Sequence, residues 1–136
     1  MRVSRKRFFA VIATVFAVVG IALSYVFYYH LSRNLVEVKA IRVSKQSPAV
    51  QRYLRWHPNA QSEIGKRYIT SDGIVYSVDD NWELIRNEGS ANKPIDSKDH
   101  YCWEVFWHDP TCLISHIVYV MIDKDSWEIV LVDEAW

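Results

Sequence analysis

Cysteine is scarce in this chain of 136 residues, which contains only Cys102 and Cys112. Neither lies near the N-terminal apolar segment, so a lipid-modified cysteine anchor of the lipoprotein type is excluded. Internal repeats and low-complexity tracts are also absent from the sequence. The formal net charge of zero conceals an uneven distribution, because the N-terminal part is basic and the part from Asp72 onward holds most carboxylates. This distribution argues against nucleic-acid binding by the C-terminal part of the chain, since such binding requires a basic face.

Charged side chains are absent from residues 8–29, which follow a basic tail containing Arg2, Arg5, Lys6 and Arg7. At about 1.5 Å per residue, a helix of this length measures about 33 Å, which is enough to cross a hydrocarbon core of about 30 Å. Aromatic residues gather at both ends of the segment, and tyrosine rings favour the level of the lipid headgroups. We therefore expect a transmembrane helix that anchors the chain in a lipid bilayer.

The cations before the apolar segment predict that residues 1–7 form a cytoplasmic tail and that the C-terminal domain is extracytoplasmic. A cleaved signal peptide is the alternative, because Ala22-Leu23-Ser24 has the small-x-small spacing that a signal peptidase accepts. The apolar run continues past that point and exceeds the about 7 to 15 residues typical of signal peptides. This length favours an uncleaved signal anchor, and the predicted localisation is the cell membrane in a single-pass topology.

The remainder of the chain predicts a juxtamembrane segment at residues 30–46, helical in its second half, and one small domain at residues 47–136. Pro48 marks a typical helix start, because proline is favoured at the first helical position. The helix should end near Trp56, since Pro58 disfavours helical backbone at the residue before it. The sequence thus predicts a short amphipathic helix at the start of the domain.

Beyond this helix, apolar residues recur with a period of two, which is typical of strands. The last two strands are apolar on both faces and are therefore expected to be a central, covered pair, joined by a tight hairpin. Polar residues 87–99 are expected to form a mobile loop. We predict an α+β domain in which one helix packs on an antiparallel sheet of about five strands. The strand-like segments are residues 68–70, 74–78, 82–85, 101–107, 117–122 and 127–132.

Three segments resemble the core of PepSY-type domains, namely residues 103–107 (Trp-Glu-Val-Phe-Trp), residues 117–123 (Ile to Asp) and residues 128–130 (Glu-Ile-Val). Such domains carry a Trp-x-Val strand, a strand ending in Asp, a turn usually containing Thr-Gly, and a strand that opens with Glu. Here Ser126-Trp127 replaces the Thr-Gly pair, so the turn must be built differently. The resemblance implies a helix-on-sheet fold that binds or restrains protein partners and has no catalytic residues.

Cys102 and Cys112 leave three alternatives open, which are a disulfide, two buried free thiols accompanied by surface histidines, and metal ligation. A disulfide between them would close a short loop in an oxidising compartment, provided that their Cα atoms come within about 7 Å. Zinc would instead be bound by both cysteines together with His108 and His116. Their spacing lacks the close pairs of ligands that are typical of structural zinc sites.

Copper is a further alternative, because Cys112-x3-His116-x4-Met121 falls within the ligand spacing of a blue-copper loop. His57 or His100 would supply the missing imidazole. Against copper, His116 and Met121 are an odd number of residues apart and would point to opposite faces of a regular strand. We therefore expect no bound metal or cofactor, and keep the metal sites as alternatives.

Nucleophilic catalysis would need Cys112 paired with His108 or His116. The sequence provides no recognisable oxyanion hole, and so small a domain has little room for a substrate cleft. Six Trp and eight Tyr in so short a chain favour an exposed aromatic contact surface instead. We therefore expect a non-catalytic, membrane-anchored interaction module that contacts an unidentified protein partner, as an accessory subunit of a membrane complex. The alternative is a small membrane-tethered domain that binds copper or zinc.

Overall fold

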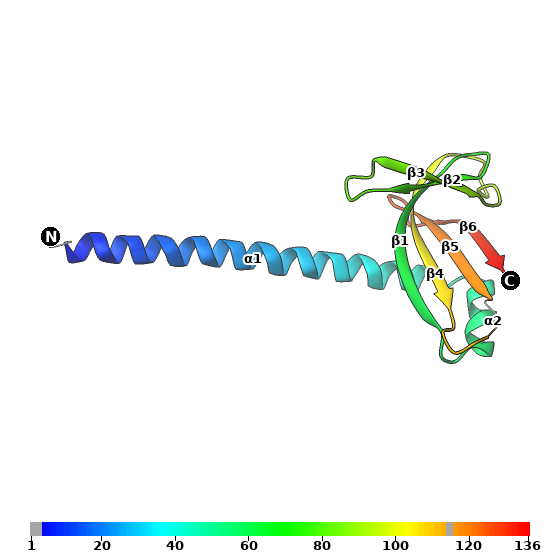
Figure 1. Cartoon of the computed structure of the whole chain (residues 1–136), viewed down its shortest axis with the longest axis horizontal. Coiled ribbons are helices and arrows are strands. Elements are labelled where there is room, and N and C mark those ends of the chain that lie inside the picture. The colour runs from blue at the N-terminus through cyan, green and yellow to red at the C-terminus, as the bar shows by residue number, and fades with distance from the viewer. Residues whose placement is uncertain (1–3, 114–115) are drawn as a thin grey trace. The chain divides into compact units, whose positions relative to one another are not determined.

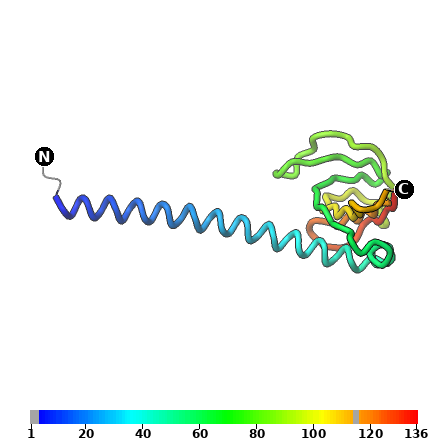
Figure 2. The backbone as a smooth tube through the Cα atoms, turned by 60° about the horizontal axis from the view of Figure 1, so that its bottom comes forward, coloured from blue at the N-terminus to red at the C-terminus, as the bar shows by residue number. Residues whose placement is uncertain are grey.

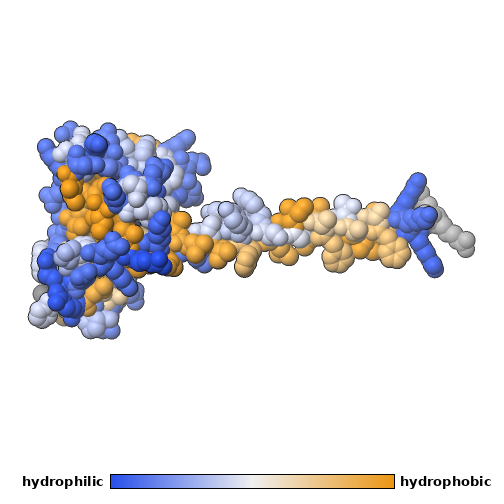
Figure 3. Space-filling view, turned by 180° about the vertical axis from the view of Figure 1, so that it is seen from behind, coloured by the Kyte–Doolittle hydropathy of each residue, from blue (hydrophilic) through white to orange (hydrophobic). Residues whose placement is uncertain are grey.

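The computed structural model describes residues 4–113 and 116–136, and the chain divides into two units, residues 1–36 and 37–136. The first unit is the greater part of one helix, α1 (Arg5–Ser44). In the part of the chain that the structure describes, every residue in the most apolar stretch of α1 is free of burial by the rest of the protein. The length and composition of the helix fit a membrane span or a signal sequence. Figure 3 shows apolar colouring along much of this helix and hydrophilic colouring at its N-terminal end.

Helix α1 continues without a break to Ser44, where we expected helix only in the second half of residues 30–46. Its last turns belong to the second unit, and Ala40 and Ser44 are fully buried there. The next helix, α2 (Pro48–Trp56), begins with proline at its first turn and ends at Trp56, as the sequence predicts.

The second unit contains one antiparallel sheet of six strands in the order β3-β2-β1-β4-β5-β6 (Figure 1). The predicted α+β architecture is confirmed, with six strands where we expected about five. Helix α2 and the β2–β3 hairpin lie at opposite ends of the folded domain in both views (Figures 1 and 2). The strands are β1 (Gln61–Ile69), β2 (Ile74–Val78), β3 (Leu84–Ser90), β4 (His100–His108), β5 (Ile117–Asp123) and β6 (Ile129–Ala135).

Two hydrophobic clusters lie on the two faces of this sheet, because alternate residues of a strand point to opposite faces. Val105 is fully buried in the first cluster, where β4 and β5 pack against α2 and the last turns of α1. Burying such a side chain contributes about 1.5 to 3 kcal/mol. Cys102 and Met121 lie in the second cluster with residues of β1, β2 and β6. The first cluster contains Ala40, Val50, Tyr53, Val105, Trp107, Val118, Val120 and Ile122.

Two expectations about the strands are wrong. β6 is an edge strand and not part of a central pair, although Ile95 N–H donates a hydrogen bond to Val130 O at 2.9 Å. The segment that contains Ile95 thus covers part of an edge that the apolar composition of β6 would otherwise leave open. The first residues of the predicted loop 87–99 belong to the exposed edge strand β3, so the loop is shorter than expected.

The predicted hairpin between β5 and β6 is confirmed. The Asp123 carboxylate accepts backbone hydrogen bonds from Asp125 at 2.9 Å and from Ser126 at 2.8 Å, which fixes the turn. Trp127 then adopts the left-handed conformation, with φ of 62°. The turn therefore places a tryptophan at a position where glycine is the usual residue.

Candidate functional site

A pocket of about 430 Å³ lies beside α2, between this helix, the loop after β4 and the C-terminal end of β6. Its wall is mostly apolar surface from aromatic rings and Ala49, with a few polar groups among them. A volume of this size lies in the range of natural ligand pockets, roughly 300 to 1,000 Å³. The lining residues are Ala49, Arg52, Tyr53, Trp56, His57, Cys112, His116, Glu134 and Trp136.

Helix α2 brings four side chains to the pocket because they occupy one helical face. Ala49, Arg52, Tyr53 and Trp56 follow the spacing i, i+3, i+4 and i+7, which places them one above another. The helix ends immediately afterwards at His57, so the imidazole leaves the helical face and approaches the loop after β4. Local helix geometry thus builds one complete wall of the pocket.

Aromatic contacts fix the rings at the floor of the pocket. The buried Tyr53 ring stacks on His57 with ring centres 4.3 Å apart, and its hydroxyl donates a hydrogen bond to His116 O at 2.9 Å. His116 in turn stacks on Trp136, with ring centres 3.8 Å apart and planes only 7° apart. The indoles of Trp56 and Trp136 are nevertheless each 82% exposed. The rings therefore form an ordered aromatic surface with two accessible indoles.

Glu134 lies between two basic side chains at the rim of the pocket. One carboxylate oxygen lies 3.3 Å from Arg52, and the other lies 3.3 Å from His116 Nε2. The carboxylate is thus shared between the helix and the segment that leads into β5. Because its main charged groups are already paired, the pocket suits an apolar occupant better than an ionic one.

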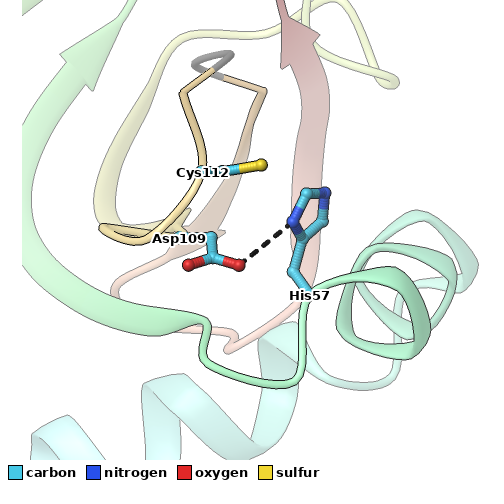
Figure 4. A group of neighbouring side chains, drawn as sticks. All are labelled: His57, Asp109 and Cys112. Carbon is cyan, nitrogen blue, oxygen red and sulfur yellow. Dashed lines mark hydrogen bonds and ion pairs between the residues drawn. The ribbon is translucent and has the colours of Figure 1, made fainter.

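A thiol, an imidazole and a carboxylate converge at one side of the pocket (Figure 4). His57 Nδ1 lies 3.2 Å from Asp109 Oδ2, and ligand atoms of His57, Asp109 and Cys112 all lie within 4.8 Å of one another. His57 comes from the end of α2, whereas Asp109 and Cys112 come from the loop after β4. We call this group the His57–Asp109–Cys112 cluster.

Thr111 holds the Asp109 carboxylate in place. Its backbone N–H donates to Asp109 Oδ1 at 2.9 Å and its hydroxyl donates to the same oxygen at 2.6 Å. These hydrogen bonds, followed by that from His57, hold the pKa of Asp109 below its usual range. The side chain of Asp109 is only 6% exposed, and these hydrogen bonds satisfy its carboxylate there.

The disulfide that the sequence left open is not formed, and Cys102 and Cys112 are both free thiols. Cys102 is fully buried near the start of β4, whereas Cys112 lies exposed in the loop after its end. The strand from Cys102 to His108 spans about 20 Å, since a strand rises about 3.3 Å per residue. Cys112 lies beyond the far end of this span, beside His57, whereas Cys102 lies in the second hydrophobic cluster.

The zinc and copper ligand sets that we kept as alternatives are not assembled among the described residues either. Cys102 and Met121 belong to the second hydrophobic cluster and do not line the pocket. The ring of His108 packs against Phe106, and its Nε2 lies 3.2 Å from Glu63 Oε1. Of those predicted ligands, Cys112 and His116 reach the pocket.

His100, one of the two imidazoles considered for copper, lies at the start of β4. It is held there between two carboxylates, Asp96 and Asp123, each at 2.8 Å. His57, the other imidazole, does lie in the pocket beside Cys112. The sequence interpretation missed Asp109, although its position three residues before Cys112 was a usable signal for two ligands on one turn.

A second hollow of about 360 Å³ lies over the sheet near the β2–β3 hairpin, where Arg67 and Glu104 contribute to its lining. Burial raises the pKa of the Glu104 carboxyl, and the Arg67 guanidinium, 3.2 Å away, opposes that shift. The two charges pair with each other, which is what a partly buried ion pair requires. This hollow is therefore explained by the fold, and the pocket beside α2 is the better candidate site.

Comparisons with protein-family models, with curated proteins and with solved structures found no match. The resemblance to PepSY-type domains accordingly stays a prediction. Function has to be inferred from the residues that line the pocket and from their chemistry.

Proposed function

We propose that this protein is a single-pass, membrane-anchored binding module without catalytic activity. Its PepSY-like domain lies outside the cytoplasm and holds an apolar side chain of a protein partner in the pocket beside α2. The observation that carries this proposal is the exposure of Trp56 and Trp136, each 82% exposed, at a pocket of about 430 Å³. Partner binding at this site fits an accessory subunit of a membrane complex.

Exposed indoles beside a preformed pocket support a binding role. Tryptophan is enriched among the residues that dominate the energy of protein interfaces, because it buries a large rigid surface at low entropic cost. The Tyr53 hydroxyl and the stacked rings of His116 and Trp136 already order this surface before any partner arrives. A preordered surface loses little side-chain freedom on binding, which favours affinity.

The charges at the rim support a protein partner with an apolar anchor residue. Glu134 is engaged by Arg52 and His116, so the rim offers paired charges around an apolar centre. An apolar centre with a polar rim is the usual organisation of a protein interface. An isolated ionic ligand would have to displace one of these pairs.

The apolar part of α1 supports anchoring in a membrane. A helix of 40 residues spans about 60 Å, so the hydrocarbon core accounts for only part of its length. The basic residues Arg5, Lys6 and Arg7 at its start favour a cytoplasmic N-terminus. Sodium carbonate extraction at high pH should leave the protein in the membrane, and protease added to the outer side of sealed membranes should digest only the C-terminal domain.

Site-specific photo-crosslinking in native membranes tests the partner. A benzophenone amino acid replaces Trp56 in the full chain, and the same amino acid replaces Ile85 as a matched control. Ile85 is also well exposed, at 66%, but lies on β3 at the other end of the domain. We expect one discrete protein adduct from position 56, no such adduct from position 85, and a weaker adduct when Trp136→Ala is added.

Three results would contradict the proposal. The first is the recovery of only free monomer from both positions. The second is the same set of adducts from both positions, which would indicate random collisions. The third is an adduct with lipid alone at position 56, which would make the indole a membrane contact.

A further inference from the structure

We infer that the His57–Asp109–Cys112 cluster is a binding site for one zinc ion at the side of the pocket beside α2. The inference goes beyond partner binding and does not depend on it, because the metal needs only these three side chains. It also differs from the alternative ligand sets considered from sequence spacing, with which it shares Cys112 and, in the copper set, His57, but not Asp109.

The geometry of the cluster is close to that of a tetrahedral zinc site. Ligands at the usual zinc distances of about 2.0 to 2.3 Å lie roughly 3.4 Å from one another. His57 Nδ1 and Asp109 Oδ2 are already 3.2 Å apart, and the three ligand atoms lie within 4.8 Å of one another. Closing the site therefore requires a shift of at most about 1.4 Å, which the exposed side chain of Cys112 can provide.

The donor set selects the class of metal. A thiolate, an imidazole and a carboxylate together suit zinc, whereas calcium and magnesium require oxygen ligands. Three protein ligands leave one tetrahedral position open, as in zinc sites that exchange a water molecule. His116 Nε2 is engaged by Glu134 at 3.3 Å and is therefore not counted among the ligands.

The cluster is supported by neighbouring groups, as metal ligands usually are. Thr111 fixes the Asp109 carboxylate through its backbone N–H and its hydroxyl. The ring of Tyr53 stacks on His57, which fixes the plane of the imidazole. The Cys112 backbone N–H donates to Asp109 O at 3.2 Å, so one turn presents both residues.

The same geometry argues against a catalytic relay of thiol, imidazole and carboxylate. In a relay the carboxylate and the nucleophile bind different nitrogens of the ring, which places them roughly 7 Å apart. Asp109 and Cys112 instead have ligand atoms within 4.8 Å of each other. Both face the imidazole from the same side (Figure 4), and convergence on a common point is what a metal requires.

Metal binding by the full chain in mild detergent tests the inference. The protein is reduced, stripped with a chelator, and titrated with zinc against a chromophoric competitor, and separately with cobalt(II) as a spectroscopic probe. We expect one equivalent of zinc per chain. We also expect cobalt to give a sulfur-to-metal charge-transfer band and the intense visible absorption of a tetrahedral site.

Matched variants assign the site to these residues. Cys112→Ser and His57→Gln should each weaken zinc binding by at least about 100-fold, and Cys112→Ser should abolish the charge-transfer band. Cys102→Ala and His108→Gln remove the same kinds of group elsewhere and should leave the affinity unchanged. Because Cys112 is exposed, its serine variant should keep the near-ultraviolet circular dichroism of the parent, which separates loss of a ligand from loss of the fold.

Failure to bind stoichiometric zinc would overturn the inference, as would unchanged affinity in Cys112→Ser. Neither result would affect the crosslinking expected at position 56. Conversely, zinc binding with no protein adduct at that position would sustain the metal site and contradict the proposed function.

Discussion

The indole Nε1 of Trp107 donates a hydrogen bond to Ser44 Oγ at 3.1 Å, although the two residues are 63 positions apart in the sequence. Both side chains are buried, and the Ser44 hydroxyl donates in turn to Ile41 O at 2.8 Å. The last turn of α1 is thereby joined to β4 at the centre of the first hydrophobic cluster. A polar chain of this kind is stable in a core only when each of its members is satisfied.

Replacing Trp107 with phenylalanine should lower the free energy of unfolding by about 1 to 3 kcal/mol. The substitution shrinks the ring and leaves the buried Ser44 hydroxyl without its indole donor. Thermal unfolding of the full chain in detergent, followed by near-ultraviolet circular dichroism, measures the effect. The control is Trp56→Phe at an exposed position, where the change should stay within about 0.5 kcal/mol. An equal effect at both positions would show that the buried hydrogen bond is unimportant.

At position 127, glycine should be better tolerated than alanine. Trp127 has φ of 62°, a conformation that costs an L-residue roughly 1 kcal/mol and glycine almost nothing. Both substitutions lose the contact between the Trp127 ring and Lys39 Nζ, which lies 4.2 Å from the ring centre. The difference in stability between the two variants therefore measures the backbone strain at this position. We expect Trp127→Gly to melt about 4 °C or more above Trp127→Ala.

Trp103, in the interior of β4, provides the matched comparison for position 127. There glycine should be the worse substitution, because it weakens a strand interior. The same order of stability at both positions would rule out the backbone explanation. The measurement is again the midpoint of thermal unfolding.

Stability should depend on pH through His100 and Asp123, which lie 2.8 Å apart. Burial lowers the pKa of His100, but hydrogen bonds to Asp96 and Asp123 outweigh it and raise the pKa. Because the pKa of His100 is higher in the folded state, its protonated ring stabilises the fold fully below the unfolded-state pKa of about 6.5. This stabilisation is lost as the pH rises through the folded-state pKa. The protein should therefore lose stability in mildly alkaline buffer.

On the acid side, burial raises the pKa of Asp123, but hydrogen bonds from Ser126, His100 and Asp125 outweigh it and lower the pKa to about 2. Its contribution is present above about pH 4 and is lost as pH falls towards 2. Melting temperatures measured from pH 3 to pH 9 should thus be highest between about pH 4 and 6.5. His100→Gln should flatten the alkaline limb, and a limb that keeps its slope would exclude His100 as the cause.

The two thiols should differ sharply in reactivity. Cys112 is exposed, whereas Cys102 is fully buried, and burial together with Asp123 and Glu104 raises the pKa of its thiol to about 12. The thiolate is the reactive form, so N-ethylmaleimide should label Cys112 in the native protein and Cys102 only after unfolding. Mass spectrometry of tryptic peptides checks this result, with Cys112→Ser as the control that should remain unlabelled until denaturant is added. Labelling of Cys102 in the native state would contradict its burial.

Helix α2 shows which features of the fold could be predicted from the sequence. Its start at Pro48, its end before Pro58 and its buried face all depend on residues within a few positions of one another. The turn at Asp123 and the alternating pattern of β4 are equally local. The edge position of β6 could not be predicted, because an apolar strand normally lies inside a sheet. Here the segment that contains Ile95 covers the strand, and nothing local in the sequence indicates this long-range contact.

An apolar N-terminal helix and an α+β domain follow from local residue patterns, because helix length, capping and strand periodicity are properties of neighbouring residues. Which side chains meet depends instead on long-range strand pairing. Pairing of β1 with β4 brings Gln61 opposite His108, so the chain after α2 reaches the loop that carries Asp109. His57 and Cys112 become neighbours through that long-range pairing, and spacing along the chain carries no information about it.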